Sequence, residues 1–112
     1  MAKEHGAMEG RLRACFEGLA DFHRMKMINL LLEKEMNVTA LCAHFTMRQP
    51  SVSHHLGVLK KGGIVKTRRQ GKEILYSVNR KYLSSMMTYY FARFGFMVKE
   101  MDASGPVPGE TP

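Results

Sequence analysis

Cysteine is scarce in this chain, and the two that occur, Cys15 and Cys42, lack the Cys-X-X-Cys spacing of a zinc or redox site. Two cysteines are also too few to staple a disulfide-rich fold, so we expect both to be reduced thiols. Long apolar runs are missing as well, since none approaches the roughly 18 residues that span a bilayer. The first residues lack the apolar core of a signal peptide. The sequence therefore predicts a cytoplasmic protein without a membrane partner.

Acidic residues are absent from one long stretch. No Asp or Glu occurs from Met36 to Lys72, although seven Lys and Arg residues do. These seven account for the whole net charge of +7, because the other ten of the 17 basic residues are matched by the ten acidic ones. Positive charge focused in this way is the electrostatic footprint of a nucleic-acid-binding face.

Motifs of catalysis are also missing. The sequence shows no carboxylate pair, no nucleophile–base motif and no Gly-rich phosphate loop, so we expect neither an enzyme nor a cofactor. With 112 residues, of which 45% are hydrophobic, the chain has room for one folded domain. A domain of this size buries only about 60 to 65% of its unfolded surface, which favours a second copy as a source of further burial.

Apolar residues repeat at helical spacing in five segments. The expected helices cover residues 8–19, 22–35, 38–45, 49–61 and 81–101. Asp21 and Thr39 are the expected N-caps of the second and third helices, and Pro50 fits the first turn of the fourth. Gly62 and Gly63 then end this fourth helix.

Two short β-rich runs, 64–70 and 73–78, follow these glycines and are joined around Gly71. Ile74, Tyr76 and Val78 alternate along the second run, and the pair reads as a hairpin with a basic tip. We expect one domain over residues 8–101. It is flanked by a flexible segment at 1–7 and by a disordered tail, rich in Gly and Pro, at 102–112.

Two short helices joined by a tight turn and followed by a hairpin are the parts of a winged helix-turn-helix. The segments LADFHRMKMINLLL, QPSVSHHLGVLKKGGIV and RRQGKEILYSVN resemble the ArsR/SmtB family of bacterial winged-helix repressors, over roughly residues 16–80. The resemblance implies a mainly α homodimer with a two-stranded wing. Its fourth helix would enter the major groove of an inverted-repeat operator on double-stranded DNA, with the hairpin beside the minor groove.

Side chains suited to DNA occur where this arrangement needs them. Gln49 can pair with adenine through two hydrogen bonds, and short polar groups suit base edges and phosphates. Arg48 stands where the family usually has a Ser N-cap, and His55 is expected either to pack or to contact a phosphate. The expected DNA-binding residues are Arg48, Gln49, Ser51, Ser53, His54, His55, Lys60, Lys61, Arg68, Arg69 and Lys72.

An apolar seam on the first and last helices predicts the dimer interface. Its residues are Leu12, Phe16, Leu83, Met87, Tyr90, Phe94 and Met97. The same long helix leaves open a protein-interaction module that docks a partner there.

Metal ligands are missing from the positions where the family carries them. Asn37 and Thr39 occupy the places of two thiolates, and residues 74–99 contain no Asp, Glu, His or Cys, so we expect no metal site. Cys15 and Cys42 remain as candidate sensor thiols, with Cys15 favoured by the positive charge of neighbouring arginines. Two alternatives stay open: both cysteines are packing residues, or the regulator responds to no ligand. The inducer is unknown.

Overall fold

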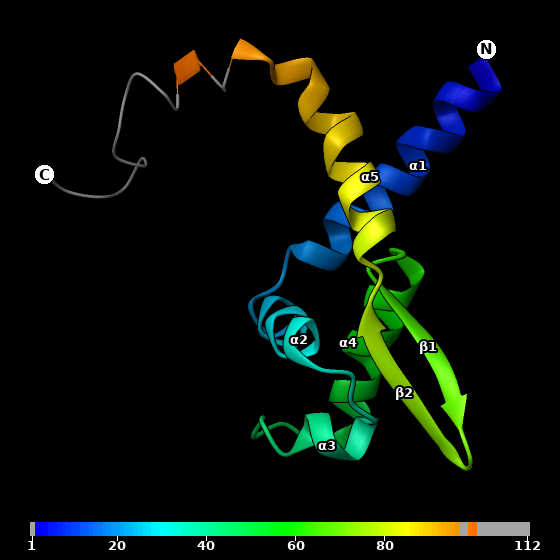
Figure 1. Ribbon diagram of the computed structural model, residues 1–112, viewed down its shortest axis with the longest axis vertical. Helices are drawn as coiled ribbons and strands as arrows, with labels where there is room; N and C mark the ends of the chain where they lie inside the picture. The colour runs from blue at the N-terminus through cyan, green and yellow to red at the C-terminus, as the bar shows by residue number, and fades with distance from the viewer. Residues whose placement is uncertain (1, 97–98, 101–112) are drawn as a thin grey trace, which may run out of the picture.

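The computed structural model describes residues 2–96, 99 and 100, and its helices and hairpin form a winged helix-turn-helix, as predicted (Figure 1). In chain order the elements are α1 (Ala2–Leu19), α2 (Phe22–Glu33), α3 (Val38–Cys42), α4 (Gln49–Lys61), β1 (Val65–Gln70), β2 (Glu73–Val78), α5 (Arg80–Phe91) and the 3-10 helix η1 (Ala92–Phe94). Helices α1 and α5 cross at one end of the molecule, and α2, α3, α4 and the wing form the other. None of the described helices is both long and apolar enough to cross a membrane.

The helix starts follow side-chain capping. Asp21 caps α2 as predicted, since its Oδ1 accepts a hydrogen bond from the Arg24 amide at 3.1 Å. The predicted cap of α3, Thr39, was wrong, because Asn37 fills that role with its Oδ1 2.7 Å from the Ala40 amide. Helix α3 also ends at Cys42, earlier than expected. The chain tightens there into a turn, in which the Phe45 amide bonds to the Cys42 carbonyl.

Both outer helices differ from their expected lengths. Helix α1 begins at Ala2, so it includes residues that were expected to precede the domain. The last helix was expected to run to Met101 without a break, yet α5 ends at Phe91 and is followed by η1 and Gly95, after which Phe96, Lys99 and Glu100 are again helical. Glycine is a poor helix former, which accounts for a break at this place. Met97 and the expected tail at 102–112 lie outside the described residues.

The core forms where α4 packs against α1 and the base of the wing. The predicted stripe of Val52, Leu56 and Leu59 is fully buried on α4. Gly62 permits a close approach to α1, because a Cβ there would lie 2.7 Å from the Ala14 carbonyl oxygen. Gly63 supplies the left-handed backbone that ends the helix, with a φ of 75°.

The wing is an antiparallel hairpin whose register runs from Val65 opposite Val78 to Gln70 opposite Glu73. Burial increases steadily along β2 toward its base, in place of the predicted alternation. Met36, in the connector between α2 and α3, exchanges two backbone hydrogen bonds with Tyr76, at 3.0 and 2.8 Å. This isolated antiparallel bridge joins the two-stranded wing to the connector between the helices.

Candidate nucleic-acid interface

Helix α4 presents a polar face to solvent opposite its buried stripe. This face consists of Gln49, Ser51, Ser53 and His54, preceded by Arg48 at the N-cap, and all five residues are exposed. Arg48 makes no side-chain capping bond, so its guanidinium is not used to close the helix. Short donors and acceptors on an exposed helix, beside a cation, can reach both base edges and phosphates.

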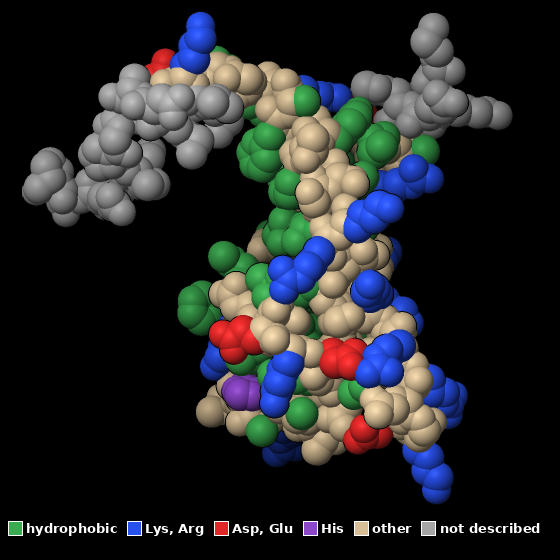
Figure 2. All heavy atoms as spheres, in the orientation of Figure 1, with side chains coloured by type: hydrophobic (Ala, Val, Ile, Leu, Met, Phe, Trp, Pro, Cys, Tyr) green, Lys and Arg blue, Asp and Glu red, His purple; other side chains and the backbone are tan. Residues whose placement is uncertain are grey.

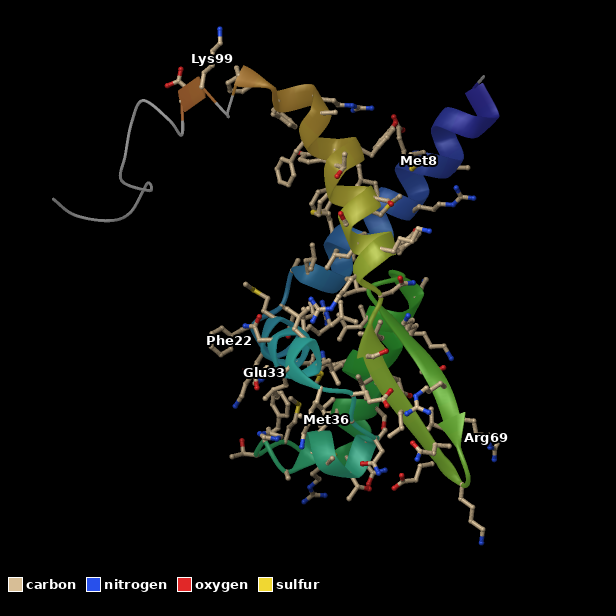
Figure 3. The ribbon with its side chains drawn as sticks, in the orientation of Figure 1. Met8, Phe22, Glu33, Met36, Arg69 and Lys99 are labelled. Atoms are coloured by element: carbon tan, nitrogen blue, oxygen red, sulfur yellow. The ribbon has the colours of Figure 1, made fainter. Side chains whose placement is uncertain are left out.

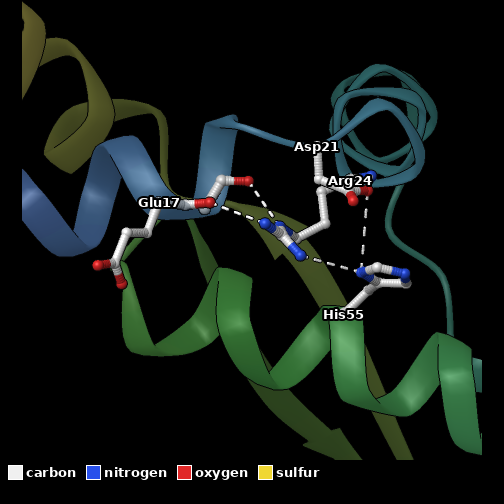
Figure 4. Close-up of polar contacts among 5 residues, drawn as sticks. Glu17, Asp21, Arg24 and His55 are labelled. Carbon is white, nitrogen blue, oxygen red and sulfur yellow. Dashed lines mark hydrogen bonds and ion pairs between the residues drawn. The ribbon is translucent and has the colours of Figure 1, made fainter.

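His55 does not belong to that polar face. Its side chain is only 15% exposed and turns toward α2, where Nδ1 lies 3.1 Å from Arg24 Nη1 and 3.9 Å from an Asp21 carboxylate oxygen (Figure 4). Burial lowers the pKa of His55. The charge of Asp21 raises this pKa, and the charge of Arg24 lowers it further. The expected phosphate contact was wrong, and the alternative role in packing is the one observed.

Cations surround the hairpin, and Figure 2 shows Lys and Arg side chains along the side of the molecule that carries it. Lys60 and Lys61 are exposed at the end of α4, and Arg69 and Lys72 are exposed on the wing. Arg69 lies on the outer side of β1 (Figure 3), with a weak hydrogen bond of 3.3 Å to the Gly71 carbonyl. Exposed cations in this position can neutralise DNA phosphates.

Arg68 differs from its neighbour on the wing. Its guanidinium binds the Glu35 carboxylate through Nε and Nη2 and also donates to Gln70 Oε1 at 3.2 Å. The pair lowers the pKa of Glu35 and raises that of Arg68. In this structure Arg68 links the wing to the α2–α3 connector, and its contact with a phosphate stays a prediction.

The sequence of the chain matches a known protein family. Residues 21–67 match the family "Bacterial regulatory protein, arsR family". The transcriptional repressor SdpR of Bacillus subtilis is 32% identical over 74 residues, which cover 66% of this chain and 82% of the relative. The chain belongs to the ArsR family. It is thus a DNA-binding transcriptional regulator, as its resemblance predicted, and the family consists of regulators and not enzymes.

Other members of the ArsR family match over similar lengths. A probable mercury resistance operon repressor of Streptomyces lividans is 30% identical and covers 85% of this chain and 76% of its own length. Among solved structures, an ArsR-like regulator from a Rhodococcus species has a TM-score of 0.72 at 19% identity, over 89% of this chain and 99% of that one. A homodimeric winged helix-turn-helix DNA-binding domain from Mycobacterium bovis has a TM-score of 0.65 at 25% identity, over 85% and 84%.

The expected dimer residues of this ArsR-family chain lie where α1 meets α5. Phe16 and Tyr90 pack edge to face with ring centroids 4.8 Å apart, and the Phe94 ring lies tilted against Tyr90 with centroids 5.0 Å apart. Leu83 and Met87 are half-buried against the core. Leu12, however, is only 8% exposed within one protomer, so little of its surface is left for a partner.

Two aromatic residues that the sequence prediction omitted lie exposed beside this seam. Phe91 is 46% exposed at the end of α5, and Phe96 is 63% exposed just beyond it. Both fall outside the four-and-three spacing from which the seam was predicted, so that periodicity gave no signal for them.

The two thiols of the ArsR-family chain have different environments, and that of Cys15 agrees with the alternative in which it is a packing residue. Cys15 is completely buried, and burial raises the pKa of its thiol, whereas a reactive cysteine needs an exposed, acidic thiol. Cys42 is partly exposed on α3. The preference for Cys15 as a sensor was therefore wrong. Within the described residues, no three His, Cys, Asp or Glu side chains are grouped to hold a metal ion.

Proposed function

We propose that the protein is a homodimeric repressor that binds an inverted-repeat operator on double-stranded DNA, with α4 in the major groove and the wing beside the minor groove. The observation that supports this most directly is the exposed polar face of α4, which lies in the same acid-free segment as the cations of the wing. Polar side chains of a helix read base edges, while the cations hold the phosphate backbone.

The side chains divide into these two roles. Gln49 and His54 are exposed on α4 and carry the donors and acceptors that recognise bases. The phosphate contacts come from exposed cations without a carboxylate partner among the described ion pairs. These are Arg48, Lys60, Lys61, Arg69 and Lys72.

The second copy docks on the face formed by α1 and α5. Phe91 and Phe96 expose large apolar areas there, and burying such side chains drives association. A similar solved structure, the domain from Mycobacterium bovis, is a homodimer. A protein-interaction module would instead leave the helix free for an unrelated partner, so a stable homodimer that covers α5 argues against it.

The signal that releases DNA does not come from the metal sites of the family. Asn37 caps α3 and Thr39 lies in its first turn, and neither side chain is a thiolate. If the protein responds to an oxidant or a soft metalloid, the response runs through Cys42, because Cys42 is the partly exposed thiol. A regulator that responds to none of these reagents has the same fold and retains its operator affinity in their presence.

The test is selection of bound DNA from a random pool of duplexes, followed by titrations with the selected duplex. We expect an inverted repeat whose half-site centres are about 34 to 36 Å apart, one helical turn. With about six to ten phosphate contacts per dimer, affinity falls about 10³- to 10⁵-fold between 50 and 200 mM salt. Failure to enrich any sequence, or binding that ignores salt, contradicts the proposal.

A further inference from the structure

Arg24 lies where three helices meet, and all three nitrogens of its guanidinium have partners (Figure 4). Nε and Nη2 donate to the carbonyl oxygens of Gly18 and Glu17, at 2.9 and 2.8 Å. These carbonyls belong to the last turn of α1, where backbone acceptors have no partner within the helix. Nη1 lies 3.1 Å from Nδ1 of His55 on α4. One side chain of α2 thus joins the end of α1 to the helix that faces DNA.

The chemistry of this contact fixes the protonation of the ring. A guanidinium only donates hydrogen bonds, so Nδ1 of His55 must be the acceptor, and the ring is neutral with its proton on Nε2. A proton on Nδ1 would place two N–H donors face to face, and the imidazolium would repel the guanidinium of Arg24. The bond between Arg24 and His55 therefore exists only while Nδ1 is unprotonated.

We infer that Arg24 and His55 are positioning residues for DNA binding: the neutral imidazole lets Arg24 hold α4 in its reading orientation against α1, and protonation of Nδ1 releases it. The inference rests on the proposed function. It predicts that the affinity for DNA falls as the medium becomes acidic, through a residue that does not touch DNA. His54, the next residue along the chain, is on the exposed face, so a small rotation of α4 displaces it from a base.

The groups around the ring determine the direction of this effect. Burial lowers the pKa of His55, and the charges of Arg24, His23 and His54 lower it further, while Asp21 raises it. The His23 and His54 rings lie 5.8 and 5.9 Å from it. On the α1 side, the Glu17 carboxylate is paired with Arg13. The Asp21 carboxylate lies 3.9 Å from Nδ1, so a protonated His55 ring can form an ion pair with Asp21 in place of its hydrogen bond with Arg24.

The lowered pKa of His55 determines how DNA affinity and folding stability change with pH. Above the ordinary histidine pKa of about 6.5 the ring is neutral in the folded and unfolded chain, and the contact is fully present. As the pH falls below that value, the folded state resists protonation, and the contact is lost when the pH passes through the pKa of the folded protein. DNA affinity and folding stability both fall in this window.

A matched set of variants tests the inference on the selected duplex at constant ionic strength, between pH 5.5 and 8. His55→Asn places an oxygen near Nδ1 that accepts from Arg24 and does not titrate. His55→Leu removes the acceptor. His23→Asn is the control, because it deletes a nearby exposed imidazole.

We expect the wild type and His23→Asn both to lose affinity toward acid pH, with the decline of His23→Asn starting at a higher pH, because the charge of His23 lowers the pKa of His55. The decline should approach about tenfold per pH unit for each ring that must lose its proton to bind. His55→Asn should keep its affinity across the range, and His55→Leu should bind weakly throughout. The ratio of affinities between His55→Asn and wild type removes every effect of pH on DNA binding that does not involve residue 55. A ratio that does not change with pH overturns the inference.

A second measurement needs no DNA. The His55 ring is followed by NMR titration of the free protein, in the wild type and in Arg24→Lys, which keeps the charge but not the three-way geometry. The inference predicts a higher pKa for His55 in Arg24→Lys, and identical titrations overturn it. If no variant binds DNA at any pH, the proposed function fails, while this titration still tests the junction.

Discussion

Arg68 on the wing donates hydrogen bonds to the carboxylate of Glu35 in the α2–α3 connector, with Nε 2.9 Å from Oε2. A cation that the sequence assigned to DNA thus faces another part of its own protein. Just beyond it, the Asn37 amide donates to Glu73 at 2.8 Å. The two acids that flank the acid-free segment, Glu35 and Glu73, therefore both tie the wing to the helices.

Exchanging the charges of this pair tests whether Arg68 positions the wing. Arg68→Glu alone should weaken DNA binding several-fold, because it breaks the tie and places two carboxylates together. Adding Glu35→Arg should restore most of the affinity, since the pair re-forms with its charges reversed. In salt titrations, Arg69→Gln should reduce the slope by about 0.9 per protomer, while Arg68→Gln leaves it unchanged. Equal losses in slope would identify Arg68 as a phosphate ligand.

Base recognition and phosphate binding are separable by mutation. Gln49→Ala and His54→Ala should each reduce discrimination between the selected duplex and random DNA by about 1 to 3 kcal/mol. Arg69→Ala should weaken binding to both duplexes equally, since a phosphate contact carries no sequence information. Competition titrations give both quantities, and unchanged discrimination in Gln49→Ala and His54→Ala would place base recognition elsewhere.

Dimerisation is testable at two neighbouring aromatic residues. Phe91→Asp should yield a folded monomer, because Phe91 is 46% exposed and contributes little to the core of one protomer. Tyr90→Asp should also lower the melting temperature, because the ring packs against Phe16. Light scattering gives the mass and calorimetry the stability. A wild type that is monomeric at micromolar concentration would refute the dimer.

The accessibility of the two thiols predicts their rates of reaction. Cys42 should react with a maleimide or an aromatic disulfide reagent in the native protein, whereas Cys15 should react only when the protein opens. The variants Cys15→Ser and Cys42→Ser assign the two phases. Operator binding under peroxide, persulfide and arsenite should then change only in proteins that keep Cys42, and zinc should have no effect. Faster reaction of Cys15 would contradict its burial.

Two glycines near α4 should respond to alanine in opposite directions. Gly63→Ala forces a side chain into a backbone with a φ of 75° and onto the Tyr82 ring, so it should cost about 1 to 3 kcal/mol or more of stability. Gly57→Ala meets no atom within 4 Å and lies inside a helix, so it should stabilise by about 0.5 to 1 kcal/mol. Chemical denaturation measures both. A tolerated Gly63→Ala would contradict the described turn.

Local patterns predicted most of the fold, because they depend on residues close together in sequence. The buried stripe of α4, the cap at Asp21 and the hairpin around Gly71 all follow from short-range spacing. The errors at helix ends have local causes too: Asn37 competed with Thr39 as a cap, and Gly95 follows the early end of α5.

The interactions that position the site were not predictable in this way. Arg24 meets His55 across 31 residues of sequence, and Arg68 meets Glu35 across 33. A charged residue in a helix or strand gives no sign of its partner. The burial of Cys15 likewise depends on how closely α1 packs on α4, which apolar spacing does not measure.

The two backbone bonds between Met36 and Tyr76 also set what can be exchanged between relatives. A hairpin transplanted alone would lack the Met36 bridge to β2, and a foreign connector would then determine its tilt. A graft that begins at Glu35 and ends at Val78 carries α3, α4 and the wing, together with the backbone bridge and the ion pair between Glu35 and Arg68 that connect them. We expect this stretch to keep the geometry of its wing when it is moved into another member of the family.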